Sequence, residues 1–373
     1  MKTKLMLCFA GLLLFASALP AGQIERRYKV LSPISHGNLA IFPVVASSNH
    51  DTSQFLTLDE GIRSGEVVVT ESGSAAPLIR RRGPYPPPHS GAQVNNLVLI
   101  NNSKRPLLLL AGEIVTGGKQ DRVIGKDRIV PAESDPIDLG VFCVEPGRWV
   151  ARSEKFGTIA GLAQPSVRAK AMVDKDQQKV WDQVAESRSA LIAAAPPPPS
   201  VGGPAMAGAA ARTTTSYAMT VESTEIKKQL DEVVIPMQLS YTQLIHQLRE
   251  RNAVGVVVAV NGQIIWADIF ASPSLLEKYW PKLVRSYAAE AVGERATNKH
   301  VTEADAEAFL ENLQGNHEVV DTEAGLFRQA EISGSNFKVF QLTSLLPNTG
   351  FDVHVAKMNN SDSPYTVGRV RPQ

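Results

Sequence analysis

Two glutamates end two apolar segments in the first half of the chain, at positions where they could do chemistry. Leu107–Ala111 is followed by one glycine and then Glu113, and Leu139–Val144 is followed directly by Glu145. An ionised group at the end of a buried strand is costly unless it is paired, so its placement needs a reason. That reason is catalysis, ligand binding or an internal ion-pair network, and the sequence leaves all three open.

Two carboxylates that flank one cleft are the arrangement of glycoside hydrolases. Arginines argue against that reading, because a guanidinium lowers the pKa of a neighbouring carboxylate, whereas a general acid needs a raised pKa. Arg148 stands three residues after Glu145, and we expect Glu113 to face the strand of Arg122. A structural network or a site for an anionic or sugar-like ligand is therefore favoured over a hydrolase. The candidate site comprises Glu113, Gln120, Arg122, Glu145, Arg148 and Trp149.

Other patterns predict neither a cofactor nor a metal site. The histidines are scattered and share no ligand spacing with carboxylates. Gly117-Gly118-Lys119 lacks the spacing of a phosphate-binding loop, and a turn between strands is the better interpretation. Cys143 lies in an apolar run, which is typical of a small buried hydrophobe rather than a nucleophile.

The first residues have the organisation of a secretory signal peptide. Two lysines precede the uncharged apolar segment Leu5–Leu19, and small residues allow cleavage after Ala18 or Ala21. We assign residues 1–21 to the signal and expect an exported protein, periplasmic or extracellular. No later segment reaches the roughly 18 apolar residues of a spanning helix, so we expect no membrane span after signal removal.

Charge composition bears on the class of partner. The chain has 38 Lys and Arg against 37 Asp and Glu, so no basic excess points to a nucleic acid. Arg80-Arg81-Arg82 precedes a proline-rich stretch, where a solvated loop is favoured over a docking loop for an anionic surface. The remaining partners are an unknown small molecule or a protein.

The order of predicted elements indicates an α+β fold rather than an alternating βαβ fold. The strand-rich N-terminal half should form a sandwich-like antiparallel sheet, followed by central helices and a C-terminal strand–helix–strand region. We divide the mature chain into a strand-rich part (22–163), a helix (164–192), a mobile Pro/Ala/Gly-rich spacer (193–216) and an α+β part (217–373). The last part is expected to pack with 22–163 as one domain, although two domains remain an alternative.

Local signals place several elements. Asn261-Gly262 between two β-branched runs predicts a hairpin, and Gly125-Lys126 predicts a second one between Asp121–Ile124 and Asp127–Val130. Ser272 followed by proline predicts a helix start. Pro236 should break or kink a helix over Glu225–Arg251.

Several long motifs resemble the ARPP domain family, the ARG and rhodanese-phosphatase-superfamily-associated protein domain. The resemblance covers most of the mature chain and carries no established reaction, but it implies that the polar residues and the Tyr279–Tyr287 helix belong to one framework. The export signal and the long spacer depart from the pattern expected of a typical member. The motifs are Gly112-Glu113, Gly117–Arg122, Cys143–Trp149, Val180-Trp181, Ala267–Phe270 and Lys278–Ala288.

Three functions follow as hypotheses. The favoured one is an exported domain that binds a ligand or partner through a face with Arg122, Arg148 and Trp149. The alternatives are a hydrolase-like enzyme that uses Glu113 or Glu145, and a purely structural, envelope-associated protein.

Overall fold

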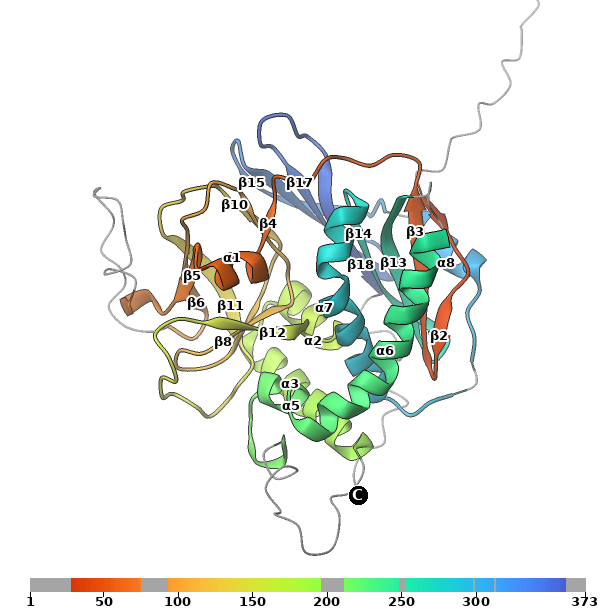
Figure 1. Cartoon of the computed structure of the whole chain (residues 1–373), viewed down its shortest axis with the longest axis horizontal. Coiled ribbons are helices and arrows are strands. Elements are labelled where there is room, and N and C mark those ends of the chain that lie inside the picture. Colours follow the sequence, from red (N-terminus) through yellow and green to blue (C-terminus); the bar gives the residue numbers. More distant parts are fainter. Residues whose placement is uncertain are drawn as a thin grey trace, which may run out of the picture.

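The computed structural model describes residues 28–74, 93–195, 211–247, 252–297, 299–311 and 313–359. The predicted signal peptide, Arg80-Arg81-Arg82 and most of the predicted spacer lie outside the described residues. Within them the chain has the predicted α+β fold. Strands dominate the first half, helices the middle and strands the end (Figure 1).

The largest sheet of the described residues combines strands from both ends of the chain. β3 pairs antiparallel with β13, so segments before and after the spacer share one sheet. In spatial order the strands are β1 (Tyr28–Val30), β3 (Leu39–Ala46), β13 (Asn252–Val260), β14 (Gln263–Phe270), β18 (Asp352–Asn359), β17 (Phe337–Ser344), β16 (Phe327–Ser333) and β15 (His317–Glu323), and β2 (Ile34–His36) pairs with β3.

Two further sheets are built from the first half of the chain. One has the order β12 (Gly157–Leu162), β8 (Glu113–Thr116), β9 (Arg122–Ile124), β11 (Ile137–Cys143), β6 (Asn96–Asn101) and β5 (Val67–Thr70). The other has the order β10 (Arg128–Val130), β7 (Leu107–Leu109) and β4 (Leu56–Thr57). Both glutamates of the candidate site are in or next to the first of these sheets.

The helices pack against these sheets. α7 (Pro273–Val292) contacts both β12 and β13, and so stands between the first-half sheets and the large sheet (Figure 1). Among the described residues, none of the helices combines the length and apolar character needed to cross a membrane. The remaining helices are α1 (Leu58–Ser64), the short 3₁₀ turn Ser72–Ser74, α2 (Pro165–Ala169), the π-helical turn Lys170–Asp174, α3 (Gln177–Ala194), α5 (Tyr217–Val221), α6 (Thr224–Gln247) and α8 (Glu303–Glu311).

Short-range signals in the sequence are confirmed. Asn261 and Gly262 have φ of 52° and 69°, as the turn between β13 and β14 requires. Ser272 accepts a hydrogen bond from the Leu275 amide at 3.1 Å and caps α7. Gly117-Gly118 forms the turn between the paired strands β8 and β9, as predicted.

The predicted hairpin at Gly125-Lys126 is wrong. β9 pairs with β8 and β11, whereas β10 pairs with β7 in another sheet. The chain crosses between sheets here because Asp127 turns inward, where its Oδ1 accepts the Ala111 amide at 2.7 Å. Gly125 is not among the described residues with positive φ, so the tight turn does not form.

Two helix boundaries also differ from the prediction. The helix predicted over 164–192 is interrupted at Lys175, whose φ of 51° separates the π-helical turn from α3. α6 continues through Pro236, so the expected break does not occur, and its buried side chains offset the missing hydrogen bond. Ser216, the last residue of the predicted mobile spacer, is buried and caps α5.

Gly112, between β7 and β8, provides a test of the packing in the centre of the fold. Its φ is +95°, and a Cβ at this position would lie 2.6–2.7 Å from three atoms of the buried Arg168 side chain. Gly325 has φ +74° but open space around it. We expect Gly325→Ala to cost about 1 kcal/mol for the backbone alone, and Gly112→Ala about 1–3 kcal/mol more because Arg168 cannot move away.

Urea denaturation measures this difference, since both variants carry a backbone penalty for a positive φ. Equal losses in the two variants would contradict the close packing of Arg168 against Gly112.

Candidate functional site

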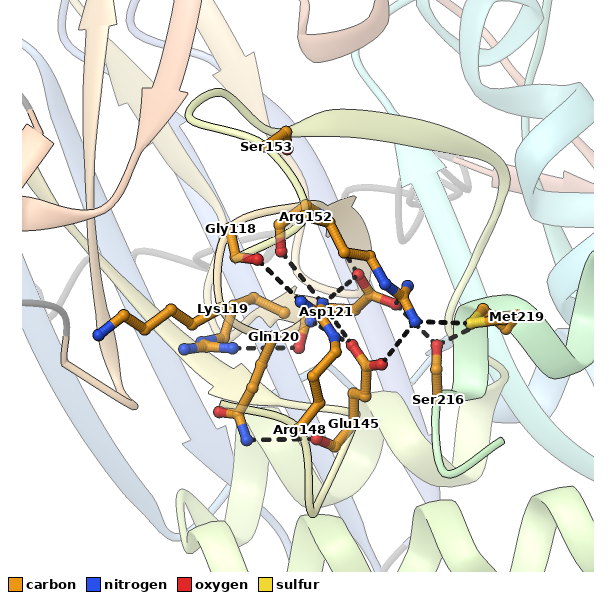
Figure 2. A network of polar contacts seen from close by, with 12 residues as sticks. Gly118, Lys119, Gln120, Asp121, Glu145, Arg148, Arg152, Ser153, Ser216 and Met219 are labelled. Carbon is orange, nitrogen blue, oxygen red and sulfur yellow. Dashed lines mark hydrogen bonds and ion pairs between the residues drawn. The ribbon is translucent and has the colours of Figure 1, made fainter. Parts of the chain in front are cut away.

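Glu145 is the centre of a network of acidic and arginine side chains (Figure 2). Its Oε2 lies 2.6 Å from Arg148 Nη2, and its Oε1 lies 3.0 Å from Arg152 Nη2. The Asp121 amide donates to Glu145 Oε2 at 3.0 Å. The Asp121 carboxylate accepts the Ser216 hydroxyl at 2.7 Å, which connects this network to the cap of α5.

Arg148 also fixes the neighbouring loops. Its Nη1 donates to the carbonyls of Gly118 at 2.8 Å and Val150 at 2.6 Å, and its Nη2 donates to Gly117 at 3.2 Å. The positive φ values of Gly117 and Gly118, 135° and 45°, turn these carbonyls toward the guanidinium. The sequence therefore correctly predicts Arg148 beside Glu145. The N–H groups of the Arg148 guanidinium, however, bind loop carbonyls of the protein itself.

The charges around Glu145 do not favour a role for its carboxyl group as an acid catalyst. Burial raises the pKa of Glu145, but hydrogen bonding by Arg148 and the charges of Arg148 and Arg152 outweigh it and hold that pKa below its usual range. Burial, together with the negative charge of Glu145, raises the pKa of Asp121. The arginines thus keep Glu145 ionised, as the sequence argument expected.

Glu113 belongs to a different pair. Its Oε1 lies 3.3 Å from Nζ of Lys282 on α7, and its Oε2 accepts the Leu110 amide at 2.9 Å. Lys282 also lies 2.8 Å from Asp59 on α1. Burial raises the pKa of Glu113 to about 7. Among the described residues Glu113 and Glu145 share no bonding partner, so the two glutamates belong to separate ion-pair groups.

Arg122 and Gln120 are buried rather than presented to a ligand. Arg122 has no exposed surface, and its Nε donates to the Val94 carbonyl at 2.8 Å. The strand of Glu113, β8, pairs with the strand of Arg122, β9, as expected, but Arg122 is in register with Val115 rather than with Glu113. Gln120 donates to the Glu145 backbone carbonyl at 3.2 Å. Trp149 is 43 % exposed, and Lys119 Nζ lies 5.0 Å from its ring centroid.

A second network, which the sequence analysis did not assemble, is completely buried. Arg168 of α2 makes two hydrogen bonds of 3.0 Å to the Asp268 carboxylate on β14. His354 on β18 bridges two carboxylates, with Nδ1 2.6 Å from Asp127 and Nε2 3.1 Å from Asp268. The Tyr287 hydroxyl donates to Asp268 as well. We call these five residues the Asp268 network.

Charges dominate the titration of the Asp268 network. Burial alone would lower the pKa of His354, but Asp127 and Asp268 raise it to about 9. Burial alone would raise the pKa of Asp268, but Arg168 and His354 hold it well below its usual range. Arg168 also lies over the Trp266 ring, 4.4 Å from its centroid. Arg168, Asp268 and His354 are therefore ionised at neutral pH, and none of the three has exposed surface.

One sequence signal points to this network, namely a charged residue inside an apolar strand. Asp268 lies between Ala267 and Ile269, and His354 lies between Val353 and Val355. The pairing itself is not readable, because Asp268 lies 100 positions from Arg168 and His354 lies 227 positions from Asp127.

Comparison with known proteins identifies the family. The model of the ARG and rhodanese-phosphatase-superfamily-associated protein domain matches residues 27–357. The chain belongs to the ARPP domain family. No curated protein and no solved structure matches it. The match covers all the candidate residues and the Asp268 network, so both lie within the ARPP domain.

The His354 pKa gives a pH-dependent prediction for the ARPP domain. Its pKa is raised to about 9 from 6.5, so its stabilising contribution is fully present below about pH 6.5 and is lost as the pH rises through about 9. The rise of the His354 pKa from 6.5 to about 9 corresponds to about 3 kcal/mol in the free energy of unfolding. We expect the free energy of unfolding to fall over this range in the wild type, and His354→Gln to remove most of that fall.

His317→Gln, at an exposed position of β15, is the control and should keep the wild-type pH dependence. NMR titration of the wild-type His354 ring should give a midpoint near 9. A midpoint near 6.5 would contradict the paired, buried geometry even if the His354 variant fails to fold.

Proposed function

We propose that this ARPP domain is an exported binding domain that recognises a protein partner through an exposed surface beside Glu145. We call this surface the Trp149 patch. One observation carries the proposal: large exposed apolar side chains gather there, with Trp149 43 %, Val150 73 % and Met219 39 % exposed. The patch comprises Lys119, Trp149, Val150, Arg152 and Met219.

Contacts hold the residues of the patch next to one another. Arg152 Nη2 lies 2.9 Å from the Met219 sulfur, and Figure 2 draws the two side chains toward each other. The Arg148 guanidinium donates a hydrogen bond to the Val150 carbonyl. The contacts of Glu145, Arg148 and Arg152 thus connect the three chain segments that form the patch, and a surface held in advance binds with a smaller entropy cost.

Residue types indicate the kind of partner. Tryptophan, methionine and arginine are enriched at protein interfaces, and tryptophan and arginine carry much of the binding energy. The Arg152 side chain is 42 % exposed and therefore accessible to a partner. Lys119 adds a second cation beside Trp149. The complementary partner presents apolar side chains next to carboxylates.

A hydrolase that uses Glu113 is the second candidate, and it has one specific observation in its favour. The Glu113 pKa of about 7 suits a general acid. However, Glu113 has no exposed surface and is bonded to Lys282, so a substrate cannot reach it in this conformation. The same contacts fit a structural pair between β8 and α7 better.

The partner is tested by site-specific cross-linking. A photoreactive p-benzoylphenylalanine at position 149 of the full chain, in the cells that produce it, should cross-link to a protein that mass spectrometry identifies. The purified partner should then bind Trp149→Ala at least tenfold more weakly, a loss of about 1.4 kcal/mol.

Val319 on β15 is a matched control, because it is also exposed, at 52 %. Cross-linking at position 319 should not give the same product, and Val319→Ala should keep the wild-type affinity. Equal affinity of Trp149→Ala and the wild type, or the same products at both positions, would overturn the proposed binding surface.

Export is tested separately from binding. The protein recovered outside the cytoplasm should have an intact mass that corresponds to cleavage after Ala18 or Ala21. Recovery of the full-length chain in the cytoplasm alone would overturn this part of the proposal.

A further inference from the structure

The large sheet ends in β15, an edge strand whose outer side faces no other described strand. β15 pairs with β16 alone among the strands of the described residues, and Figure 1 shows it at the end of the sheet. The pairing covers seven consecutive positions without a register shift, and β15 contains no proline. Bulges and prolines commonly prevent an edge strand from pairing with another chain. β15 lacks both, so its outer N–H and C=O groups are able to accept a further strand.

Exposed apolar side chains lie in the middle of this edge. Val319 is 52 % exposed and Val320 is 45 % exposed, and the two point to opposite faces because successive side chains of a strand alternate. All residues of β15 except Glu323 are exposed. A second strand beside β15 would therefore cover apolar surface on both faces of the sheet, in addition to pairing the backbone.

The carboxylates of β15 are each paired with a cation of the same chain. Charged side chains on an edge strand normally repel a second copy of that strand. Here each negative charge has a positive charge beside it, so most of this repulsion is cancelled. The three ion pairs are Arg328–Glu318 at 2.6 Å, Lys126–Asp321 at 2.7 Å and Arg128–Glu323 at 3.0 Å.

The sequence of β15 is complementary to an antiparallel copy of itself. Val320 is the middle residue of the strand, so a two-fold axis through Val320 pairs the whole strand and places the two Val320 side chains opposite each other. His317 then lies opposite Glu323, and no two carboxylates are directly opposite. An axis through Asp321 would instead oppose two like charges, which destabilises a strand pair.

We propose that β15 is a dimer interface, at which two copies of this chain join their large sheets by antiparallel pairing of β15 about Val320. One strand from each copy makes a small interface, and small interfaces give weak dimers, so we expect a Kd of about 0.1 mM. The interface shares no residue with the Trp149 patch. Dimerisation and the binding of a protein partner are therefore separate proposals, and either can fail without the other.

Sedimentation equilibrium of the full mature chain, from about 10 µM to about 1 mM, should show a reversible equilibrium between monomer and dimer. Lys126→Glu removes the cation beside Asp321 and makes the edge negative in both copies, so we expect the dimer to weaken at least tenfold. Lys175→Glu is the matched control. Lys175 is also an exposed lysine in an ion pair, but its partner Glu331 lies on β16, so this variant should dimerise as the wild type does.

A cysteine at the axis locates the contact. In Val320→Cys the two thiols should be linked by a short bis-maleimide, because Cβ atoms of opposed residues lie about 5 Å apart. The native Cys143 is buried and should not react. Leu239→Cys, at a position of α6 that is 61 % exposed, is the control and should give little linked dimer. A monomer at all concentrations, an unchanged dimer in Lys126→Glu, or equal linkage at positions 320 and 239 would each overturn the proposal.

Discussion

The buried ion pair between Arg168 and Asp268 is the constraint on which the rest of this structure depends. A guanidinium without access to water is tolerated only when its hydrogen bonds and its charge are satisfied. Arg168 meets this condition through two bonds to Asp268 and one to the Ala111 carbonyl. These contacts require β14, α2 and the chain after β7 to stay in one arrangement, with Gly112 allowing the close approach.

His354 and Asp127 extend this constraint from the large sheet to the first-half sheets. His354 lies on β18, and Asp127 lies just before β10, which pairs with β7. The same side chains therefore specify how the segments on both sides of the spacer pack together. Buried ion pairs add little net stability over apolar packing, but breaking one partner is costly, so such a network favours a unique arrangement.

Most charged groups near the predicted site also form buried or partly buried ion pairs. Glu145 is bonded to two arginines and Glu113 to a lysine, so both carboxylates are held in ion pairs. The accessible feature is the Trp149 patch, which lies beside the ion pairs of Glu145. The fold thus separates the charges that hold it together from the surfaces that are available for binding.

Sequence reasoning succeeded where the cause is local. Asn261-Gly262 sets its own turn and Ser272 caps its own helix, so neighbouring residues suffice to predict both. Glu145 and Arg148 are three residues apart, and their pairing was readable for the same reason. The partner of Glu113 could not be predicted, because Lys282 lies 169 positions away on a helix. The hairpin at Gly125 failed because a distant histidine and a backbone amide determine the position of Asp127.

A double-mutant cycle between Asp127 and His354 tests the central claim most directly. Unfolding free energies of Asp127→Asn, His354→Gln and the double variant, at a pH below 6.5, give the coupling between the two segments. If this contact connects them, the coupling exceeds about 1 kcal/mol. Additive effects within about 0.5 kcal/mol would contradict the account, because the two side chains would then act independently.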